Sequence, residues 1–247
     1  MFPQIYYFSS VENSFDNYIF IGTEHGGSTL VDYMKNQNVG YIEIKKIFYN
    51  LIKAFHYLKE KNIVHNDITP INIVVKSPDE IKMIDFEISF KCIKKYEGSA
   101  FHKFTPSKYA NELYLSPELR AQRRMPDMII CVLYDPFKSD VFSLGLSILS
   151  ACGIDVTNLN CFGQGYEVFI KSMLTISYGY IAYDSLKRIS YRLIREELQK
   201  AIDEAIKKFP YDILRNTLRR MLEVDIVERA TIDEIYKDAK FYVGIFN

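Results

Sequence analysis

His65-Asn-Asp-Ile-Thr-Pro-Ile-Asn72, followed by Ile84-Asp-Phe-Glu87, is the pair of stretches on which the interpretation of this chain depends. The first contains an Asp and, five positions later, an Asn; the second brings another Asp after a predicted β-hairpin. Because a hairpin returns the chain on itself, these three side chains can meet at one point. Together they can hold a nucleophile and divalent metal ions against a nucleotide phosphate.

The residues before and between these stretches predict two strands, two helices and a hairpin. The strands are expected at residues 4–10 and 17–22, and the hairpin at 72–76 and 81–84. Ser28 is expected to cap a short helix from Thr29 to about Asn36. From Tyr41 to Lys61 apolar residues recur at helical spacing, so an amphipathic helix is expected directly before the His65 stretch.

The rest of the chain predicts mainly helices. Residues 88–117 lack periodicity and are expected to form a long surface loop. Helices are expected further on, at residues 139–152, 164–174, 191–208, 211–223 and 231–237. Few strands and many helices indicate a mostly helical body with little sheet.

Composition restricts the class of partner and compartment. The chain has 31 basic and 31 acidic residues and no net charge, so neither a nucleic acid nor an anionic membrane is expected as a partner. It has four cysteines without C-x-x-C spacing, which predicts reduced thiols. Neither a signal peptide nor a bilayer-length apolar run is recognisable, so we expect an intracellular, cytoplasmic protein.

The order of these features resembles the C-terminal lobe of a eukaryotic protein kinase of the Ser/Thr type. Each matching segment resembles one motif of that family, in the family's order: Tyr18-Ile-Phe-Ile-Gly22 with the hinge that follows, the His65 stretch, Asp85-Phe-Glu87, Ser116-Pro-Glu118, Ser139-Asp-Val-Phe-Ser-Leu-Gly145 and Glu228-Arg-Ala-Thr231. The resemblance implies an α+β, protein kinase-like fold. It divides the chain into residual N-lobe strands and hinge at residues 1–25 and a C-lobe at residues 26–247.

The resemblance also implies a site that uses ATP and Mg²⁺ and acts on, or binds, a protein. Asp67 and Thr69 are implied as catalytic residues, with Asp67 taking the proton of the attacking hydroxyl. Asn72 and Asp85 are implied as Mg²⁺ ligands. The adenine would contact the residues implied as the nucleotide pocket: Ile21 as gatekeeper, the backbone of Gly22 and Glu24, and Val74 beneath the base.

Other residues are implied to be architectural. Glu118 and Arg229 would form a buried ion pair, and Asp140 would bind the backbone of the catalytic loop. His65 and Phe86 would belong to a stacked apolar column between the lobes. Thr105, Ser107 and Tyr109 fall in the segment that family members phosphorylate, but such residues are common there and prove no phosphorylation.

The chain also departs from the family pattern. No Gly-rich phosphate loop and no strand Lys precede the expected hinge, so phosphoryl transfer is expected if a longer parent protein supplies an N-lobe, and this chain alone is expected to be weak or inactive. Asn66, Thr69 and Glu87 replace the Arg, Lys and Gly of the family motifs, and Asn111 stands where a Thr usually contacts the catalytic Asp. Glu87 is expected to limit the freedom of the backbone beside Asp85.

These departures leave three functions open. The first is a protein Ser/Thr kinase, and the second is an inactive pseudokinase that serves as a binding module. The third is a choline/ethanolamine-type small-molecule kinase, whose members carry His-x-Asp and Asp-Phe-Glu sequences similar to those at His65 and Asp85. That third class lacks the segments seen here around Glu118 and Arg229, which makes it the least favoured.

Overall fold

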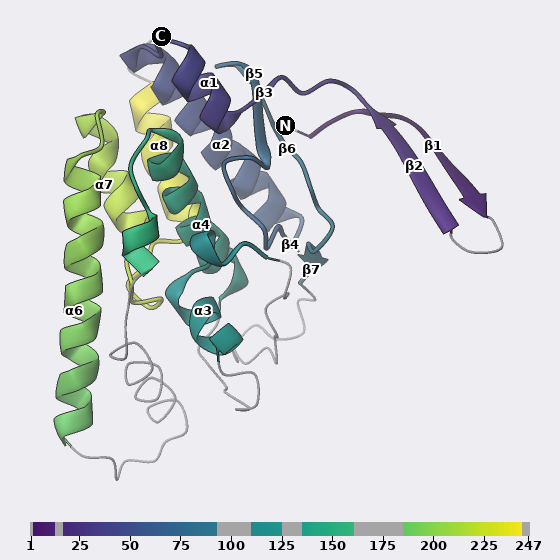
Figure 1. Cartoon of the computed structure of the whole chain (residues 1–247). Coiled ribbons are helices and arrows are strands. Elements are labelled where there is room, and N and C mark those ends of the chain that lie inside the picture. Colours follow the sequence, from purple (N-terminus) through teal and green to yellow (C-terminus); the bar gives the residue numbers. More distant parts are fainter. Residues whose placement is uncertain (1, 13–16, 93–109, 125–134, 161–184, 244–247) are drawn as a thin grey trace.

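The computed structural model describes residues 2–12, 17–92, 110–124, 135–160 and 185–243 of the chain. A body made mostly of helices holds a small sheet on one side, and a two-stranded hairpin extends away from that body (Figure 1). This combination of helices with few strands is the expected α+β, protein kinase-like fold. None of the helices in these ranges is long and apolar enough to cross a bilayer.

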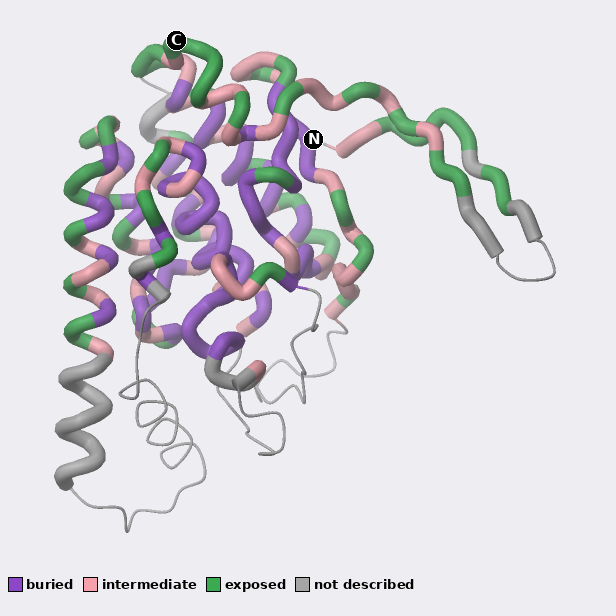
Figure 2. Tube along the Cα trace, viewed as in Figure 1, coloured by how far each residue is buried: buried purple, intermediate pink, exposed green. Residues whose placement is uncertain are grey.

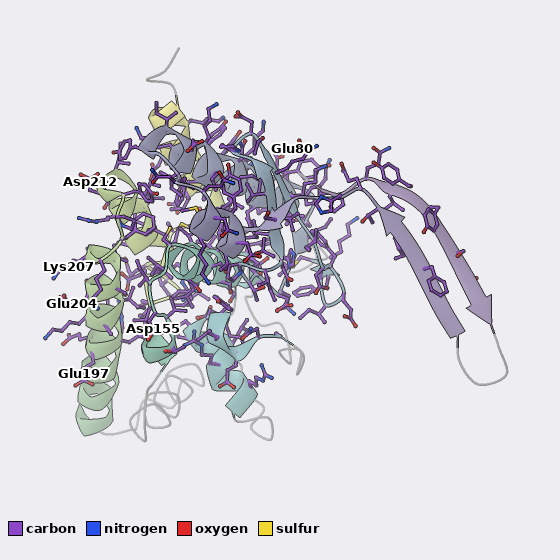
Figure 3. All side chains as sticks on the ribbon, turned by 45° about the horizontal axis from the view of Figure 1, so that its top comes forward. Glu80, Asp155, Glu197, Glu204, Lys207 and Asp212 are labelled. Atoms are coloured by element: carbon purple, nitrogen blue, oxygen red, sulfur yellow. The ribbon has the colours of Figure 1, made fainter. Side chains whose placement is uncertain are left out.

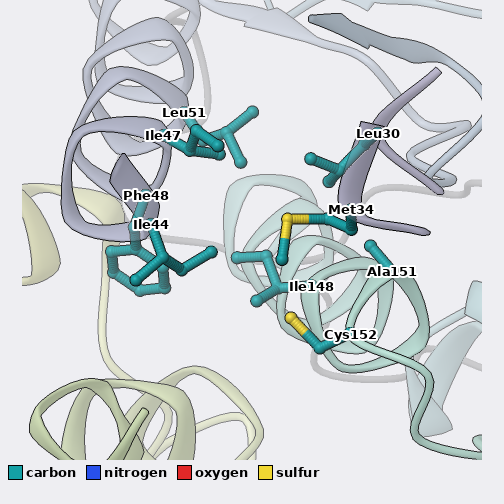
Figure 4. A pocket seen from close by; sticks show the side chains of 9 residues that line it. All are labelled: Leu30, Met34, Ile44, Ile47, Phe48, Leu51, Ile148, Ala151 and Cys152. Atoms are coloured by element: carbon teal, nitrogen blue, oxygen red, sulfur yellow. The ribbon is translucent and has the colours of Figure 1, made fainter. Parts of the chain in front are cut away.

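Helix α2 (Tyr41–Glu60) lies in the core of the body. All the apolar positions that predicted the helix are buried: Ile44, Ile47, Phe48, Leu51, Ile52, Phe55 and Leu58. Helix α8 (Ile232–Val243) packs along α2, where the rings of His56 and Tyr236 stack with centroids 4.2 Å apart. Side chains of α2, of the short helix α1 (Leu30–Asn36) and of α4 (Pro136–Ala151) line a small apolar pocket of about 10 Å³ (Figure 4).

Local capping decides where two helices begin. The predicted cap of α1, Ser28, is wrong, because the Thr29 Oγ1 accepts the Asp32 amide hydrogen bond at 3.2 Å and the helix starts one residue later. Helix α4 starts before its predicted first residue because Asp135 Oδ1 accepts two amide hydrogen bonds, from residues 137 and 138, and Pro136 fills the first turn.

A three-stranded sheet supports the candidate site. Its strand order is β3 (Ser28–Thr29), β5 (Ile73–Ser77), β6 (Glu80–Met83), and the β5–β6 pair is the predicted hairpin. A second small sheet pairs β4 (Ile63–Val64) with β7 (Phe90–Lys91). Strand β7 thus lies inside the region predicted to be loop. The sequence did not predict it because it is short and carries no period-2 pattern of its own.

The remaining elements complete the body. Helices α6 (Ser185–Lys207) and α7 (Asp212–Met221) lie where helices were predicted, although α6 begins six residues earlier than predicted. Helix α3 (Pro117–Arg124) and the 3₁₀ turns η2 (Glu112–Tyr114) and η3 (Thr157–Asn160) were not predicted, and η2 lies inside the region expected to be loop. The helix predicted at residues 164–174 lies outside the described residues, as do Thr105, Ser107, Tyr109, Cys131 and Cys161. Cys92 and Cys152 are free thiols.

The hairpin consists of β1 (Ile5–Glu12) and β2 (Asn17–Thr23), paired antiparallel with a register shift near its base. Unlike the helical body, which is largely buried, the hairpin is exposed along most of its described length (Figure 2). Tyr6, Tyr7, Phe20 and Ile21 are each more than half exposed. Within the described ranges, no other strand pairs with either strand of this hairpin.

Candidate active site

The loop that follows β4 carries Asp67 and is fixed from beneath by α4. The buried carboxylate of Asp140 accepts hydrogen bonds from the backbone amides of His65 at 2.8 Å and Asn66 at 3.0 Å. This confirms the expected contact between the central helix and the loop. Burial raises the pKa of Asp140 to about 7, although the two amide hydrogen bonds act in the opposite direction.

Asn66, which replaces an Arg in the family pattern, has a structural use of its own. Its backbone is in the left-handed region, with φ of 67°, and Asn tolerates that conformation better than most residues. Its side-chain Nδ2 donates to the carbonyl of Ile88 at 3.3 Å. Asn66 therefore links the loop before Asp67 directly to the segment that follows Asp85.

Asp67 lies at the centre of the site and is half-buried. The Asn72 Nδ2 donates to the Asp67 carbonyl at 2.9 Å and to its Oδ2 at 3.1 Å. The backbone amide of Asn111 donates to the Asp67 Oδ1 at 3.3 Å. A backbone donor therefore contacts this carboxylate where the family uses a Thr side chain, and the carboxylate is fixed from two sides.

The β5–β6 hairpin places Asp85 beside this pair. The amide of Ile84 donates to the Asn72 carbonyl at 3.0 Å, so the residue after it leaves the sheet next to Asn72. Asp85 is exposed and has a left-handed φ of 63°. Its carboxylate and the amide oxygen of Asn72 are hard ligands of the kind that Mg²⁺ takes, with phosphate oxygens and water completing the shell.

His65 joins the two halves of the site. Its Nε2 is 3.1 Å from the Ile84 carbonyl and its ring centroid is 4.5 Å from that of Phe86. Burial lowers the pKa of His65 more than the Ile84 carbonyl and the carboxylates of Asp67 and Asp85 raise it. A neutral imidazole that donates from Nε2 fits this arrangement. Phe2, which sequence reasoning did not identify, extends the column, since the centroid of its ring lies 5.7 Å from that of Phe86.

Two substituted positions behave differently from expectation. Thr69 is 2 % exposed, and its hydroxyl oxygen is buried without a hydrogen-bond partner among the described residues. The structure therefore does not give Thr69 the access to a phosphate that was predicted from its place in the loop. Glu87 is exposed and does not have a positive φ, so a side chain causes no backbone strain there.

Of the residues predicted to contact adenine, Ile21 lines a cavity, whereas Gly22 and Val74 pack closely against other residues. Ile21 shares a cavity of about 570 Å³ with Asp85 and the stacked column; its apolar lining includes Phe2, Ile5, Leu58, Met83 and Phe86. Gly22 lies under the ring of Tyr7, where a β-carbon would be 2.1 Å from the Tyr7 side chain. Val74 is buried beneath Gly26, where a β-carbon would be 2.4 Å from the Val74 Cγ2.

Glu24 is placed differently from the prediction. Its amide, expected to face the adenine, donates to the Gln4 carbonyl at 3.0 Å, because the ladder of β1 and β2 continues to this residue. Its carboxylate contacts the ammonium group of Lys82, a residue that sequence reasoning missed. The sequence held an indication that Lys82 is buried, because Lys82 lies between apolar neighbours on a strand that was predicted to form the hairpin.

A buried ion pair joins α3 to the chain before α8. Arg229 Nη1 donates to Glu118 Oε1 at 2.7 Å, Nη2 donates to Oε2 at 3.0 Å, and both side chains are essentially inaccessible. Ser139 adds a hydrogen bond to Oε1 at 2.7 Å. Burial acts to raise the pKa of Glu118, but Arg229 and Ser139 outweigh it and hold the pKa below its usual value. The expected pair is confirmed.

Within the described ranges, no three His, Cys, Asp or Glu side chains converge as a metal cage. The metal would therefore depend on Asp85, Asn72 and the oxygens of a bound phosphate. The chemistry of this donor set fits Mg²⁺, whose sites commonly combine one or two protein oxygens with substrate phosphates.

Comparison with known proteins agrees with this geometry. The chain is 30% identical over 143 residues to the probable serine/threonine-protein kinase MRK1 homolog of Encephalitozoon cuniculi, which is 58% of this chain and 40% of that protein. It is 32% identical over 148 residues to the MAP kinase kinase MKK1/SSP32 of Saccharomyces cerevisiae, 58% of this chain and 25% of that protein. The aligned part thus covers less than half the length of either relative. The family described as the protein kinase domain matches residues 2–241, and this chain belongs to it.

Proposed function

We propose that this chain carries the catalytic half of a protein Ser/Thr kinase, which transfers the terminal phosphate of ATP to a hydroxyl of a protein. In this proposal residues 1–25 are the last N-lobe strands with the hinge, and residues 26–247 are the C-lobe. The observation that carries it is the arrangement of Asp67, Asn72 and Asp85 at one end of the β5–β6 hairpin, on a loop anchored by Asp140.

Each of these residues has a role that its chemistry suits. The fixed carboxylate of Asp67 accepts the proton of the attacking hydroxyl. Asn72 and Asp85 would hold Mg²⁺, which would neutralise charge on the phosphates when bound. The remaining requirement is a segment that covers the phosphates, because positioning and charge neutralisation supply most of the acceleration in phosphoryl transfer. We propose that a longer parent protein supplies this segment as its N-lobe.

The test is phosphoryl transfer from labelled ATP to a general protein substrate by the native protein, purified from its own cells. Asp67→Asn is expected to lower kcat by about 10²–10⁴-fold, because it removes the general base. Asp79→Asn is the matched control, since Asp79 lies in the exposed turn of the same hairpin and pairs with Lys46 on the surface. Equal activity of Asp67→Asn and wild type would contradict the proposal.

A second candidate is a pseudokinase, a binding module that keeps the fold without the transfer. The burial of the Thr69 hydroxyl favours it, because the side chain that stands in place of the family's Lys is not accessible to a phosphate. In that case the native protein would show no transfer, with or without the Asp67 substitution. It would nevertheless keep the architectural contacts of Asp140 and of Glu118 with Arg229.

A further inference from the structure

Lys82 is a buried cation that none of the roles described above uses. It lies within β6, where it is the cross-strand partner of Val74, the residue proposed to lie beneath the adenine. Directly opposed residues of an antiparallel pair point to the same face of a sheet. Lys82 is 8 % exposed, and an ammonium group at such a site is destabilising unless a partner compensates its charge.

The main partner of Lys82 is Glu24. The Lys82 Nζ contacts Glu24 Oε1, whereas Oε1 of Glu80 is 3.5 Å away. Glu80 is also the partner of the exposed Lys76, at 3.2 Å, and lies at the outer edge of the body, on the side away from α6 (Figure 3). The hydrogen bond from Lys82 lowers the pKa of the Glu24 carboxyl, so this partner is ionised at neutral pH.

Glu24 links Lys82 to two other parts of the chain, the segment before β1 and the hinge segment, which we define as residues 22–27. Its Oε1 accepts the amide of Gln4 at 2.7 Å, and its own amide donates to the Gln4 carbonyl at 3.0 Å. It also belongs to the hinge segment. One carboxylate therefore connects β6, the hinge segment and the chain that leads into β1.

The hinge segment is also held by the pairing of Gly22 and Thr23 with β1 and by close packing on β5. Gly27 has a φ of +105°, and a β-carbon there would be 2.4 Å from the Val75 carbonyl oxygen. Gly26 lies equally close to Val74. Both glycines fit the hinge segment onto β5, whereas the ion pair of Lys82 with Glu24 joins the segment to β6.

We propose that Lys82 is a positioning residue of the nucleotide site, which holds the hinge segment on β6 through Glu24 and so sets its distance from Val74. Strand β6 ends at Met83, two residues before Asp85, so the anchor of the hinge segment and the proposed metal-binding carboxylate lie close together along the chain. The effect on nucleotide binding rests on the proposed function, whereas the anchoring of the hinge segment is independent of it.

The first measurement is hydrogen–deuterium exchange of residues 2–27 in the full chain. Lys82→Met keeps the length of the side chain and removes its charge, so the amides of Gln4 and Glu24 are expected to exchange roughly tenfold faster. Lys82→Arg should restore wild-type exchange, because it keeps a cation. Lys76→Met, which breaks only an exposed pair, is the matched control and should change nothing here.

If Lys82→Met fails to fold, Glu24→Gln replaces it, because the amide oxygen still accepts from Gln4 while the ion pair is lost. The same acceleration is expected. Exchange of residues 2–27 at the wild-type rate in a folded Lys82→Met or Glu24→Gln variant would overturn the proposal.

The second measurement is the affinity for ATP with Mg²⁺. Lys82→Met is expected to weaken binding roughly tenfold, a change of about 1.4 kcal/mol, while Lys82→Arg and Lys76→Met bind as the wild type does. Faster exchange without weaker binding would overturn the role in nucleotide binding. If the native protein, purified from its own cells, does not bind ATP with Mg²⁺, the proposed function fails, and the exchange experiment alone decides whether Lys82 anchors the hinge segment.

Discussion

The loop of residues 65–72, which carries Asp67, and the β1–β2 hairpin differ in how their polar groups are hydrogen-bonded and in how far their apolar side chains are buried. The loop is held by Asp140 of α4, which accepts hydrogen bonds from the amides of the buried residues His65 and Asn66, and by Asn72, which donates to Asp67 within the loop. In the hairpin, β1 and β2 pair with each other and with no other strand of the described residues, and aromatic side chains such as Tyr7 and Phe20 are more than half exposed. An isolated two-stranded hairpin is marginally stable.

This difference shows which part of the fold is self-sufficient. The helical body fixes the candidate catalytic residues with contacts contained in the described part of the chain. The hairpin and the hinge segment depend on few such contacts, of which the pair of Lys82 with Glu24 is one. We therefore expect substitutions in the body to affect global stability and substitutions in the hairpin to have mainly local effects.

The largest effect is expected from breaking the buried ion pair. Arg229→Met should lower the free energy of unfolding by about 3–5 kcal/mol, because it leaves the Glu118 carboxylate buried without a counter-charge. Urea unfolding measures this change. Arg219→Met is the control: its pair with Asp203 is largely exposed, and a loss within about 1 kcal/mol is expected. Similar losses for the two variants would show that the pair of Glu118 and Arg229 is not buried in solution.

A smaller effect is expected from the ionisation of Asp140. Because burial raises its pKa to about 7, the folded protein holds a proton that the unfolded chain releases near pH 4. This contribution to stability is present below pH 4 and is lost as the pH rises through 7. Between these values wild-type stability should fall by up to about 1.4 kcal/mol per pH unit relative to Asp140→Asn, which cannot ionise.

The measurement is the free energy of urea unfolding of both proteins at several pH values from 4 to 8. Asp79→Asn provides the matched control, because this exposed carboxylate lies on the surface beside Lys46. Its difference from wild type should not vary in the same way. A constant difference between wild type and Asp140→Asn would mean that the amides of His65 and Asn66 keep Asp140 ionised in the folded state.

The sequence predicted the body better than it predicted the hinge. Periodicity was sufficient for α2, because its apolar face is continuous and fully buried, and family motifs were sufficient for Glu118, Arg229 and Asp140. The predicted role of Glu24 was wrong in one respect, since its amide pairs with Gln4. Strand register decides which amide faces a ligand, and register near a bulge cannot be derived from residue types.

Side-chain access was the other limit of sequence reasoning. Thr69 and Lys82 both carry polar groups in segments expected near the nucleotide, and both are buried. Only the three-dimensional surroundings distinguish them: the Lys82 ammonium finds Glu24, whereas the Thr69 hydroxyl finds no partner among the described residues. Motif position alone had favoured Thr69 and ignored Lys82.

The smallest effect on stability is expected from the hairpin. Phe20→Ser removes an aromatic side chain that is 53 % exposed, so the free energy of unfolding should change by no more than about 0.5 kcal/mol. Phe55→Ala is the comparison from the body: this side chain is buried in α2, and its loss should cost about 3–5 kcal/mol. Both are measured by urea unfolding. A loss above about 1 kcal/mol for Phe20→Ser would mean that Phe20 is covered in solution, by another strand or by a second molecule, and that the hairpin is as well supported as the body.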